Sequence, residues 1–249
     1  MNKTVLIIGG TSGLGRELAK QYCEENATVG IIGRRENLLE EFTDSYPKNA
    51  KACKADINSN NFNEIFLQFV QELGHIDIIV FTASIIHFNH HLDLEKEFDT
   101  INTNVVGYTR AVNLAYHYFK KVGRGHIVIV TSVAKARGNK LTPAYNASKA
   151  YQASYSDALK MKLKAEGGSI ILTEIVPGYI ETGMAKGDRI FWMSSVEKAA
   201  RLTKKAIEKK RATVFITPRW WFVYQLQRLI PRFLYHRLAN SSLTLKKKA

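Results

Sequence analysis

Short apolar runs alternate with longer amphipathic stretches along this chain of 249 residues. The runs are rich in Val and Ile and do not alternate between polar and apolar residues, which is typical of strands covered on both faces. The pattern therefore predicts parallel strands joined by crossover helices. The expected strands are residues 5–8, 28–32, 76–81, 126–131, 169–176 and 213–216, and the expected helices are residues 15–24, 37–45, 61–73, 102–121, 144–166 and 196–210.

The composition narrows the class of protein. With 45% hydrophobic and 23% charged residues, the chain is an ordinary globular protein of one or two domains. Cys23 and Cys53 provide neither a disulfide framework nor metal-ligand spacing, so we expect no metal and a reducing, cytoplasmic setting. Residues 4–8 are too short for a secretory signal, and the absence of 18 consecutive uncharged apolar residues argues against a lone membrane-spanning helix.

A glycine-rich loop follows the first expected strand and opens the first expected helix. Its glycines are spaced Gly-x-x-x-Gly-x-Gly. Glycine lets the backbone turn tightly and approach a pyrophosphate, and the helix N-terminus offers unpaired N–H groups to the phosphates. Any tight turn from strand to helix can use glycine, but this placement favours a dinucleotide site. The residues expected to bind the dinucleotide here are Gly9, Thr11, Ser12, Gly13, Leu14 and Gly15.

Two arginines follow the second expected strand. An acidic residue there would bind a ribose 2′-hydroxyl, whereas Arg34 and Arg35 suit a 2′-phosphate. We therefore expect a preference for NADP(H), with NAD(H) as the alternative, although the arginines could simply begin a solvated helix. Asp56 follows a third expected strand that ends at residues 53–55. It could bind the adenine amino group or cap the helix that begins near Asn58.

The candidate catalytic groups are a tyrosine, a lysine and a serine. Tyr145 and Lys149 are four residues apart and share one helix face, and Ser132 lies thirteen residues before Tyr145. An unperturbed phenol has a pKa of about 10. A neighbouring ammonium would lower the pKa of Tyr145 toward neutrality, where proton transfer is efficient. Alone, such a pair could be an exposed helix face, but the dinucleotide loop upstream favours catalysis.

With the glycine loop, Asp56, Asn104, Ser132, Tyr145 and Lys149 in this order, the chain resembles the short-chain dehydrogenase/reductase family over residues 3–217. The resemblance implies a Rossmann-type, doubly wound, seven-stranded parallel sheet in three α/β/α layers, and an NAD(P)-dependent reaction between carbonyl and alcohol. It implies that Asn104 holds a proton-relay water, that Ser132 orients the carbonyl, and that Tyr145 is the general acid/base. It further implies that Lys149 lowers the pKa of Tyr145 and binds the nicotinamide ribose. Further cofactor contacts are expected from Ile57, Ala83, Pro177, Gly178, Ile180 and Thr182.

The chain departs from the family pattern at three places. Ile8 replaces a threonine before the first glycine, which removes a local hydrogen bond. Residues 81–84, Phe-Thr-Ala-Ser, replace Asn-Asn-Ala-Gly, so the bracing of the sheet is in question, and Ser84 stands where a glycine would lie beside the cofactor. The catalytic set is intact, which favours an active enzyme over a catalytically quiet nucleotide-binding or membrane-associated scaffold.

Apolar residues suggest a hydrophobic substrate. Residues 183–195 lie where the family covers its substrate, and they contain Ile190, Phe191, Trp192 and Met193. Those residues could instead pack under a short helix or at a subunit contact. Another apolar group, Ile85, Ile86 and Phe88, is expected at the same mouth, whereas His87, His90 and His91 are expected on the loop surface.

The C-terminal segment is basic and aromatic. Residues 219–249 carry four arginines, three lysines and no acidic residue, which is half of the net charge of +14. We therefore divide the chain into a Rossmann domain, residues 1–218, and an amphipathic helical extension, residues 219–249, which Pro231 kinks or splits. Residues 219–240 suit peripheral contact with the inner face of a membrane, but they could instead pack on the protein's own core or on a second subunit.

The expected partners follow from the same observations. The resemblance implies a homo-oligomer, a dimer or a tetramer, formed through the helices near residues 102–121 and 144–166. We expect a small hydrophobic substrate and no nucleic acid, because no recognised nucleic-acid motif accompanies the basic segment.

Overall fold

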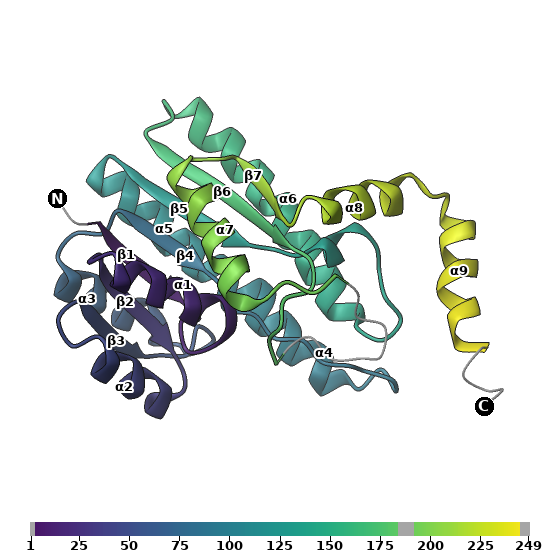
Figure 1. The fold of residues 1–249 in the computed structure, drawn as a ribbon, viewed down its shortest axis with the longest axis horizontal. Helices are drawn as coiled ribbons and strands as arrows, with labels where there is room; N and C mark the ends of the chain where they lie inside the picture. The colour runs from purple at the N-terminus through teal and green to yellow at the C-terminus, as the bar shows by residue number, and fades with distance from the viewer. Residues whose placement is uncertain (1–2, 184–191, 245–249) are drawn as a thin grey trace.

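The sheet has seven parallel strands in the order β3-β2-β1-β4-β5-β6-β7. The computed structural model describes residues 3–183 and 192–244. Helices cover both faces of the sheet (Figure 1), so the predicted doubly wound α/β/α architecture is confirmed. The strands are β1 (Thr4–Ile8), β2 (Thr28–Gly33), β3 (Ala50–Lys54), β4 (Ile78–Phe81), β5 (Gly125–Val130), β6 (Ile170–Pro177) and β7 (Thr213–Ile216).

The helices form two layers around this sheet. One apolar core joins it to α3, α5 and α6, and a second core joins its other face to α1, α2 and α7. The helices are α1 (Gly13–Glu24), α2 (Glu36–Ser45), α3 (Phe62–Leu73), α4 (Leu94–Ile101), α5 (Tyr108–Val122), α6 (Pro143–Ala165), α7 (Val196–Glu208), α8 (Arg219–Leu229) and α9 (Arg232–Thr244), with a π-helical turn η1 (Asn102–Gly107) and a 3₁₀ turn η2 (Val133–Ala136).

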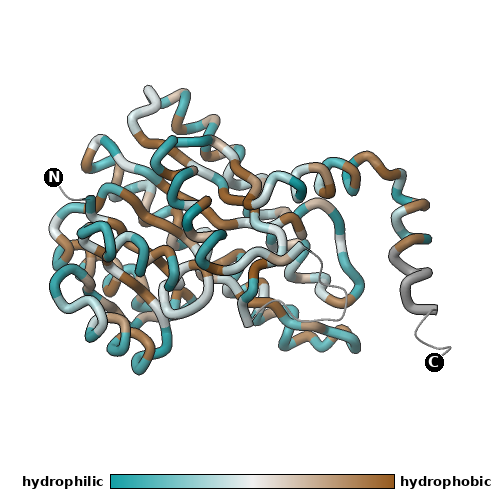
Figure 2. The backbone as a smooth tube through the Cα atoms, in the orientation of Figure 1, coloured by the Kyte–Doolittle hydropathy of each residue, from teal (hydrophilic) through white to brown (hydrophobic). Residues whose placement is uncertain are grey.

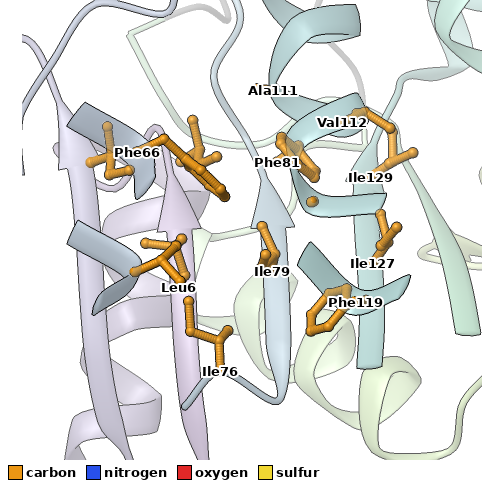
Figure 3. Close-up of a cluster of buried hydrophobic side chains, with 14 of the residues drawn as sticks. Leu6, Phe66, Ile76, Ile79, Phe81, Ala111, Val112, Phe119, Ile127 and Ile129 are labelled. Atoms are coloured by element: carbon orange, nitrogen blue, oxygen red, sulfur yellow. The ribbon is translucent and has the colours of Figure 1, made fainter. Parts of the chain in front are cut away.

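Buried side chains on the strands point alternately to the two cores. Along β4, Ile79 and Phe81 face the first core, whereas Ile78 and Val80 face the second. Figure 3 shows Ile79 and Phe81 beside Phe66 of α3 and other residues of the first core. The order of the strands reverses between β1 and β4, and an open α/β sheet binds its ligand at the carboxyl ends of the strands at this point.

The predicted helices differ from the observed ones at two places. The structure has α4 at Leu94–Ile101, where we had predicted no helix. Its signal was present, because Asp93 caps the helix by accepting a hydrogen bond from the Glu95 N–H. The expected helix at residues 102–121 begins with the π-helical turn Asn102–Gly107 and becomes α-helical at Tyr108. A π-helical turn within a helix often marks a functional site.

The C-terminal helices extend beyond the end of the sheet (Figure 1). Two residues separate the end of β7 from the start of α8, close to the domain boundary drawn at residue 218. Ile230, the residue before Pro231, has an extended ψ of 127°, as the proline ring requires. The expected split of the extension at Pro231 is therefore confirmed.

Candidate functional site

A cleft of about 1370 Å³ lies at the carboxyl ends of the central strands. It brings together the glycine loop, the ends of β2, β4 and β5, the start of α6 and the segment after β6. Of the predicted site residues, Asn104 does not line this cleft. Those that do are Gly9, Thr11, Ser12, Gly13, Leu14, Gly15, Arg34, Arg35, Asp56, Ile57, Ala83, Ser132, Tyr145, Lys149, Pro177, Gly178, Ile180 and Thr182.

The glycine loop packs too closely for side chains at two of its glycines. Gly9 has a φ of +96°, and a Cβ there would collide with the backbone of Ala83. A Cβ on Gly15 would lie 2.5 Å from the carbonyl oxygen of Gly9. Helix α1 begins at Gly13 without an acidic residue in its first turn, so its positive end is not neutralised by its own side chains. The loop therefore presents bare backbone and a helix N-terminus to the cleft.

At residues 81–84, where the chain departs from the family pattern, Thr82 and Ser84 form hydrogen bonds to neighbouring segments. The Thr82 hydroxyl lies 3.1 Å from the carbonyl oxygens of both Ile8 and Gly9, so it ties β4 to the start of the glycine loop. The Ser84 hydroxyl donates to Asn104 Oδ1 at 3.1 Å. The bracing that the sequence put in question is thus supplied by a threonine and a serine.

Arg35 is bound to the glycine loop. Its guanidinium donates to the hydroxyls of Thr11 and Ser12, both at 2.7 Å. Arg34 lies 3.6 Å from Asp56, and both of these side chains are exposed. The Asp56 carboxylate also accepts from the Asn58 N–H at 2.9 Å, which closes a turn before α3 rather than capping α3 itself. Two positive groups therefore stand together at the end of β2, beside an acid that already has partners.

The three candidate catalytic residues come from two elements. Ser132 follows β5, and its hydroxyl accepts from the Ala134 N–H at 3.1 Å, which fixes the start of η2. Tyr145 and Lys149 lie in the first two turns of α6, which begins at Pro143, a residue well suited to the first turn of a helix. The Lys149 Nζ is 5.6 Å from the centre of the Tyr145 ring.

Burial is the largest influence on the pKa of both Tyr145 and Lys149. It raises the pKa of Tyr145 above its ordinary value, while a hydrogen bond with Ser132 lowers it. Burial also lowers the pKa of Lys149 to about 7. Desolvation favours the uncharged form of both groups. That Lys149 lowers the pKa of Tyr145 stays a prediction.

Asn104 lies behind the cleft and is fully buried. Its side-chain amide bonds to Ile85 in both directions, accepting from the Ile85 N–H at 2.9 Å and donating to the Ile85 carbonyl at 2.8 Å. Its main-chain carbonyl accepts from Gln152 Nε2 at 2.9 Å. Sequence reasoning missed Gln152, although it lies three residues after Lys149 and so on the same face of α6.

The C-terminal extension forms part of the cleft wall. Trp220, Val223, Gln227 and Tyr235 all line the cleft. Of the predicted lid, Ile190 and Phe191 lie outside the described residues, whereas the Trp192 ring meets Trp220 edge-on at 6.3 Å. The apolar residues expected at the mouth also line the cleft, namely Ile85, Ile86 and Phe88.

Two cationic side chains, Arg137 and Lys135, hold the extension to the segment that follows Ser132. Arg137 donates to the main-chain carbonyls of Gln227, Arg228 and Ile230 at the C-terminal end of α8. Lys135 pairs with buried Glu174 at 2.5 Å and lies over the Tyr224 ring of α8 at 5.4 Å. No local sequence pattern predicts the contacts of Arg137 and Lys135 with α8, because their partners there are about 90 residues away along the chain.

Across residues 3–183 and 192–244, no three His, Cys, Asp or Glu side chains gather as a possible metal site. No helix in those ranges is both long and apolar enough to cross a bilayer.

Comparison with known proteins defines the class. Residues 3–190 match the family model for short chain dehydrogenases, which is more than half of the chain, so this protein belongs to the short-chain dehydrogenase/reductase family. It is accordingly a pyridine-nucleotide-dependent oxidoreductase. An uncharacterised oxidoreductase of Staphylococcus epidermidis is 29% identical over 188 residues, which cover 74% of this chain and 81% of that protein. The 11-beta-hydroxysteroid dehydrogenase-like protein 4A of Arabidopsis thaliana is 27% identical over 249 positions, which cover 93% and 82%.

Solved structures share the fold. The structure of ElxO with NADP bound has a TM-score of 0.75 and 21% identity, and the match covers 87% of this chain and 97% of that one. A short chain dehydrogenase/reductase from Burkholderia phymatum in complex with NAD has a TM-score of 0.81 and 18% identity, over 90% and 92% of the two chains. At these identities the similarity supports the fold alone.

Proposed function

We propose that this protein is an NADP(H)-dependent carbonyl reductase or alcohol dehydrogenase that acts on a lipophilic ketone or alcohol. The observation that carries the proposal is the shared cleft: Ser132, Tyr145 and Lys149 line the same cavity as the glycine loop. A reacting carbonyl held by the serine and the tyrosine would therefore lie beside a dinucleotide held by the loop.

The residues present fit a dinucleotide. Gly9 and Gly15 let the loop pack closely against the end of β4, and the N-terminus of α1 offers N–H groups and a positive dipole end to a pyrophosphate. Lys149 and the segment from Pro177 to Thr182 would hold the nicotinamide end, because they line the same cleft as the glycine loop. A bound nicotinamide supplies or accepts the hydride, and the protein supplies binding, orientation and proton transfer.

Arg34 and Arg35 support NADP(H) over NAD(H). Both line the cleft at the end of β2, where the adenine ribose of a Rossmann-bound dinucleotide lies. Arg35 is already oriented by Thr11 and Ser12, so little side-chain entropy would be lost when it bonds to a 2′-phosphate. NAD(H), which lacks this phosphate, would gain nothing from the two guanidinium groups.

The chemistry assigned to the protein is proton transfer to a carbonyl oxygen. Ser132 and Tyr145 donate hydrogen bonds to that oxygen, and these bonds strengthen as negative charge develops on it. Because burial raises the pKa of Tyr145, the phenol remains protonated at neutral pH and is ready to act as the acid of a reduction. Lys149, with a pKa of about 7, can hold or release a proton near neutral pH. It can therefore return a proton to Tyr145 after Tyr145 has protonated the carbonyl oxygen.

Apolar side chains from three segments of the chain support a lipophilic substrate. Ile85, Ile86 and Phe88 follow β4, Tyr179 and Ile180 follow β6, and Trp220 and Val223 belong to α8, and all of them line the cleft. An apolar ketone or alcohol would gain free energy by burying its surface against these side chains. The hydroxysteroid dehydrogenase-like relative is consistent with this class of substrate.

The alternative function is a nucleotide-binding or membrane-associated scaffold without turnover. A panel of long-chain and cyclic ketones and aldehydes, followed by NADPH oxidation, separates the two. We expect turnover of at least one apolar carbonyl compound, and a loss in kcat of at least about 100-fold in Tyr145→Phe, which keeps the ring and removes the proton. NADPH binding without oxidation of any compound, or equal rates for wild type and Tyr145→Phe, would favour the scaffold.

The extension supports peripheral membrane contact from the cytoplasmic side. Hydrophobic residues recur along α8 where it leaves the body of the protein (Figure 2). Phe222 and Leu229 are 66% and 81% exposed. Arginines on α8 and α9 lie among these apolar side chains, a combination that suits an anionic lipid surface. Docking there would bring the cleft wall formed by α8 near substrates dissolved in the bilayer.

A homo-oligomer is proposed through another face. Leu94 and Phe98 of α4 are more than half exposed, as is Met161 of α6, and Val106 of the π-helical turn is nearly so. Apolar side chains gathered on neighbouring helices are typical of subunit contacts. Light scattering would distinguish a monomer from a dimer or tetramer, and a monomer at micromolar concentration would contradict the proposal.

A further inference from the structure

Gln152 joins the lysine of the candidate site to the π-helical turn. Lys149 Nζ donates to Gln152 Oε1 at 3.0 Å, and Gln152 Nε2 donates to the main-chain carbonyl of Asn104 at 2.9 Å. The three residues are 2%, 1% and 0% exposed in the order Lys149, Gln152, Asn104. Both ends of one side-chain amide are therefore satisfied in a site that is shielded from solvent.

The local structure explains why this chain can form the connection. Gln152 lies one turn beyond Lys149 on α6, so the two side chains share a face. The π-helical turn packs against that face of α6 and brings the Asn104 carbonyl toward it. The Lys149 amine has one further acceptor, the Val130 carbonyl at 3.3 Å. Gln152 supplies the shorter of its two hydrogen bonds.

We propose that Gln152 is a positioning residue for the proposed reaction: it fixes the Lys149 amine and occupies the place between that amine and the Asn104 carbonyl. The family resemblance implied instead a proton-relay water held by Asn104. This inference rests on the proposed function for its kinetic consequence, but the contact itself does not depend on turnover.

The amide has a chemical consequence that a water molecule would not have. A water can accept a proton on one side while it releases one on the other, whereas a carboxamide keeps its protons near neutral pH. Gln152 therefore orients Lys149 without passing its proton inward to Asn104. Proton exchange of Lys149 then takes place on the side that faces the cleft and Tyr145.

The titratable groups around Lys149 are few. The Lys149 amine lies over the ring of Tyr145. Residues 102–107 of the π-helical turn contain no ionisable side chain. Burial is the cause of the low pKa of Lys149. Ionisable groups on the other elements that pack near α6 are bound elsewhere: His126 of β5 to Thr173, Lys135 of η2 to Glu174 of β6, Glu97 of α4 to the Ala144 N–H, and Arg110 of α5 to the Ile57 and Ser59 carbonyls.

The direct test measures the titration of Lys149 by NMR in protein that contains ¹³Cε-lysine, with Lys149→Arg to assign its signal. In the wild type this signal should titrate at about 7, well below the other lysines. Gln152→Glu places a carboxylate beside the amine and should raise the midpoint by at least about one pH unit. Gln152→Met removes the acceptor at nearly constant volume and should lower it by about one unit. Gln68→Glu, an exposed change on α3, is the matched control and should leave the midpoint unchanged.

Gln152→Glu and Gln152→Met each test the contact between Gln152 and Lys149, so one variant is sufficient if the other fails to fold. A midpoint that is the same in the wild type and in a folded Gln152 variant would overturn the proposal. The NMR titration needs neither substrate nor cofactor, so its result stands whether or not a carbonyl substrate is found. If no compound is turned over while the midpoint moves as expected, the proposed function fails and the positioning contact remains.

Kinetics then test the positioning role. With an active substrate, Gln152→Met should lower kcat about tenfold with little change in KM or in the NADPH dissociation constant. The pH midpoint of kcat should move in the same direction as the Lys149 titration. A role limited to stability would lower the melting temperature and leave the pH profile in place, and that result would contradict the proposal.

Discussion

The guanidinium of Arg137 binds the end of the first helix of the C-terminal extension: its Nε lies 2.8 Å from the main-chain carbonyl oxygen of Gln227. The same side chain also reaches the carbonyls of Arg228 and Ile230. Carbonyl groups at the C-terminus of a helix have no partner within the helix, and a cation there also meets the negative end of the helix dipole. Arg137 therefore fastens α8 to the segment that follows Ser132.

The first prediction concerns this contact. Arg137→Ala should destabilise the fold by about 2 kcal/mol, because charged hydrogen bonds of this kind contribute about 1.5–3 kcal/mol. It should also raise KM for bulky apolar substrates while the NADPH dissociation constant changes little, since α8 lines the substrate end of the cleft. Differential scanning calorimetry and steady-state kinetics provide the two measurements. Arg124→Ala, an exposed change, is the control, and equal effects of both substitutions would refute the assignment.

Local sequence patterns predicted the sheet and the cleft but not the contacts between segments that are far apart along the chain. Val- and Ile-rich runs and the glycine spacing depend on neighbours within a few residues, so the strands and the loop around Gly9 could be read directly. The contact between Arg137 and α8 joins segments about 90 residues apart. No periodicity along the sequence encodes such a contact.

The chemistry of the candidate site shows the same division. Helical spacing correctly predicted that Tyr145 and Lys149 share the cleft. It could not show how deeply each group is buried, and burial decides the pKa of both. Gln152 was overlooked because a glutamine in a helix is ordinarily exposed, and only the position of the π-helical turn makes it a partner of Lys149.

The second prediction concerns the choice of cofactor. Arg35→Ala should weaken NADPH binding by about 10- to 100-fold, the range expected when one charged hydrogen bond is lost. NADH, which lacks the 2′-phosphate, is the matched control ligand, and its dissociation constant should change far less. Titration of nucleotide fluorescence gives both constants. If the variant weakens the binding of NADPH and NADH equally, Arg35 acts only by holding Thr11 and Ser12 in place.

The third prediction concerns pH and stability. His126 is buried on β5 against the Thr173 hydroxyl, and burial, aided by Lys210 and Lys3, lowers its pKa from 6.5 to about 4. The unfolded chain therefore binds a proton below pH 6.5 that the folded protein takes up only near pH 4. Stability from this group is present above pH 6.5 and is lost as the pH falls toward 4, by about 3 kcal/mol in all.

Urea unfolding at pH 7.5, 5.5 and 4.5 tests this effect of His126. His126→Gln removes the titrating group, so the difference in unfolding free energy between wild type and variant should shift in favour of the variant as the pH falls. His117→Gln, at an exposed site on α5, should show no such trend. Parallel pH curves for the wild type and His126→Gln would contradict the prediction.

The fourth prediction concerns the proposed membrane contact. Replacing exposed Phe222 and Leu229 by Ser should reduce binding to vesicles that contain anionic lipid by at least about tenfold, since each side chain buries apolar surface on docking. Vesicle sedimentation at low and high salt provides the measurement, and neutral phosphatidylcholine vesicles should bind weakly throughout. Leu67→Ser, an exposed leucine on α3, serves as the control. Vesicle binding that survives the double substitution would place any lipid contact elsewhere.

The fifth prediction concerns the junction between the cofactor segment and α8. Gly178 follows β6 and lies directly under the indole of Trp220, which is buried, so a methyl group on Gly178 would overlap the ring. Gly178→Ala should therefore displace Trp220, change the tryptophan fluorescence and destabilise the protein by about 1–3 kcal/mol, as overpacking does. Because Pro177 and Gly178 line the cleft, the NADPH dissociation constant should rise as well. Gly138→Ala is the matched control, since a Cβ at Gly138 would meet open space. If Gly178→Ala leaves the fluorescence and the cofactor affinity unchanged, α8 is not packed on the cofactor segment in solution, and the extension does not help to shape the cleft.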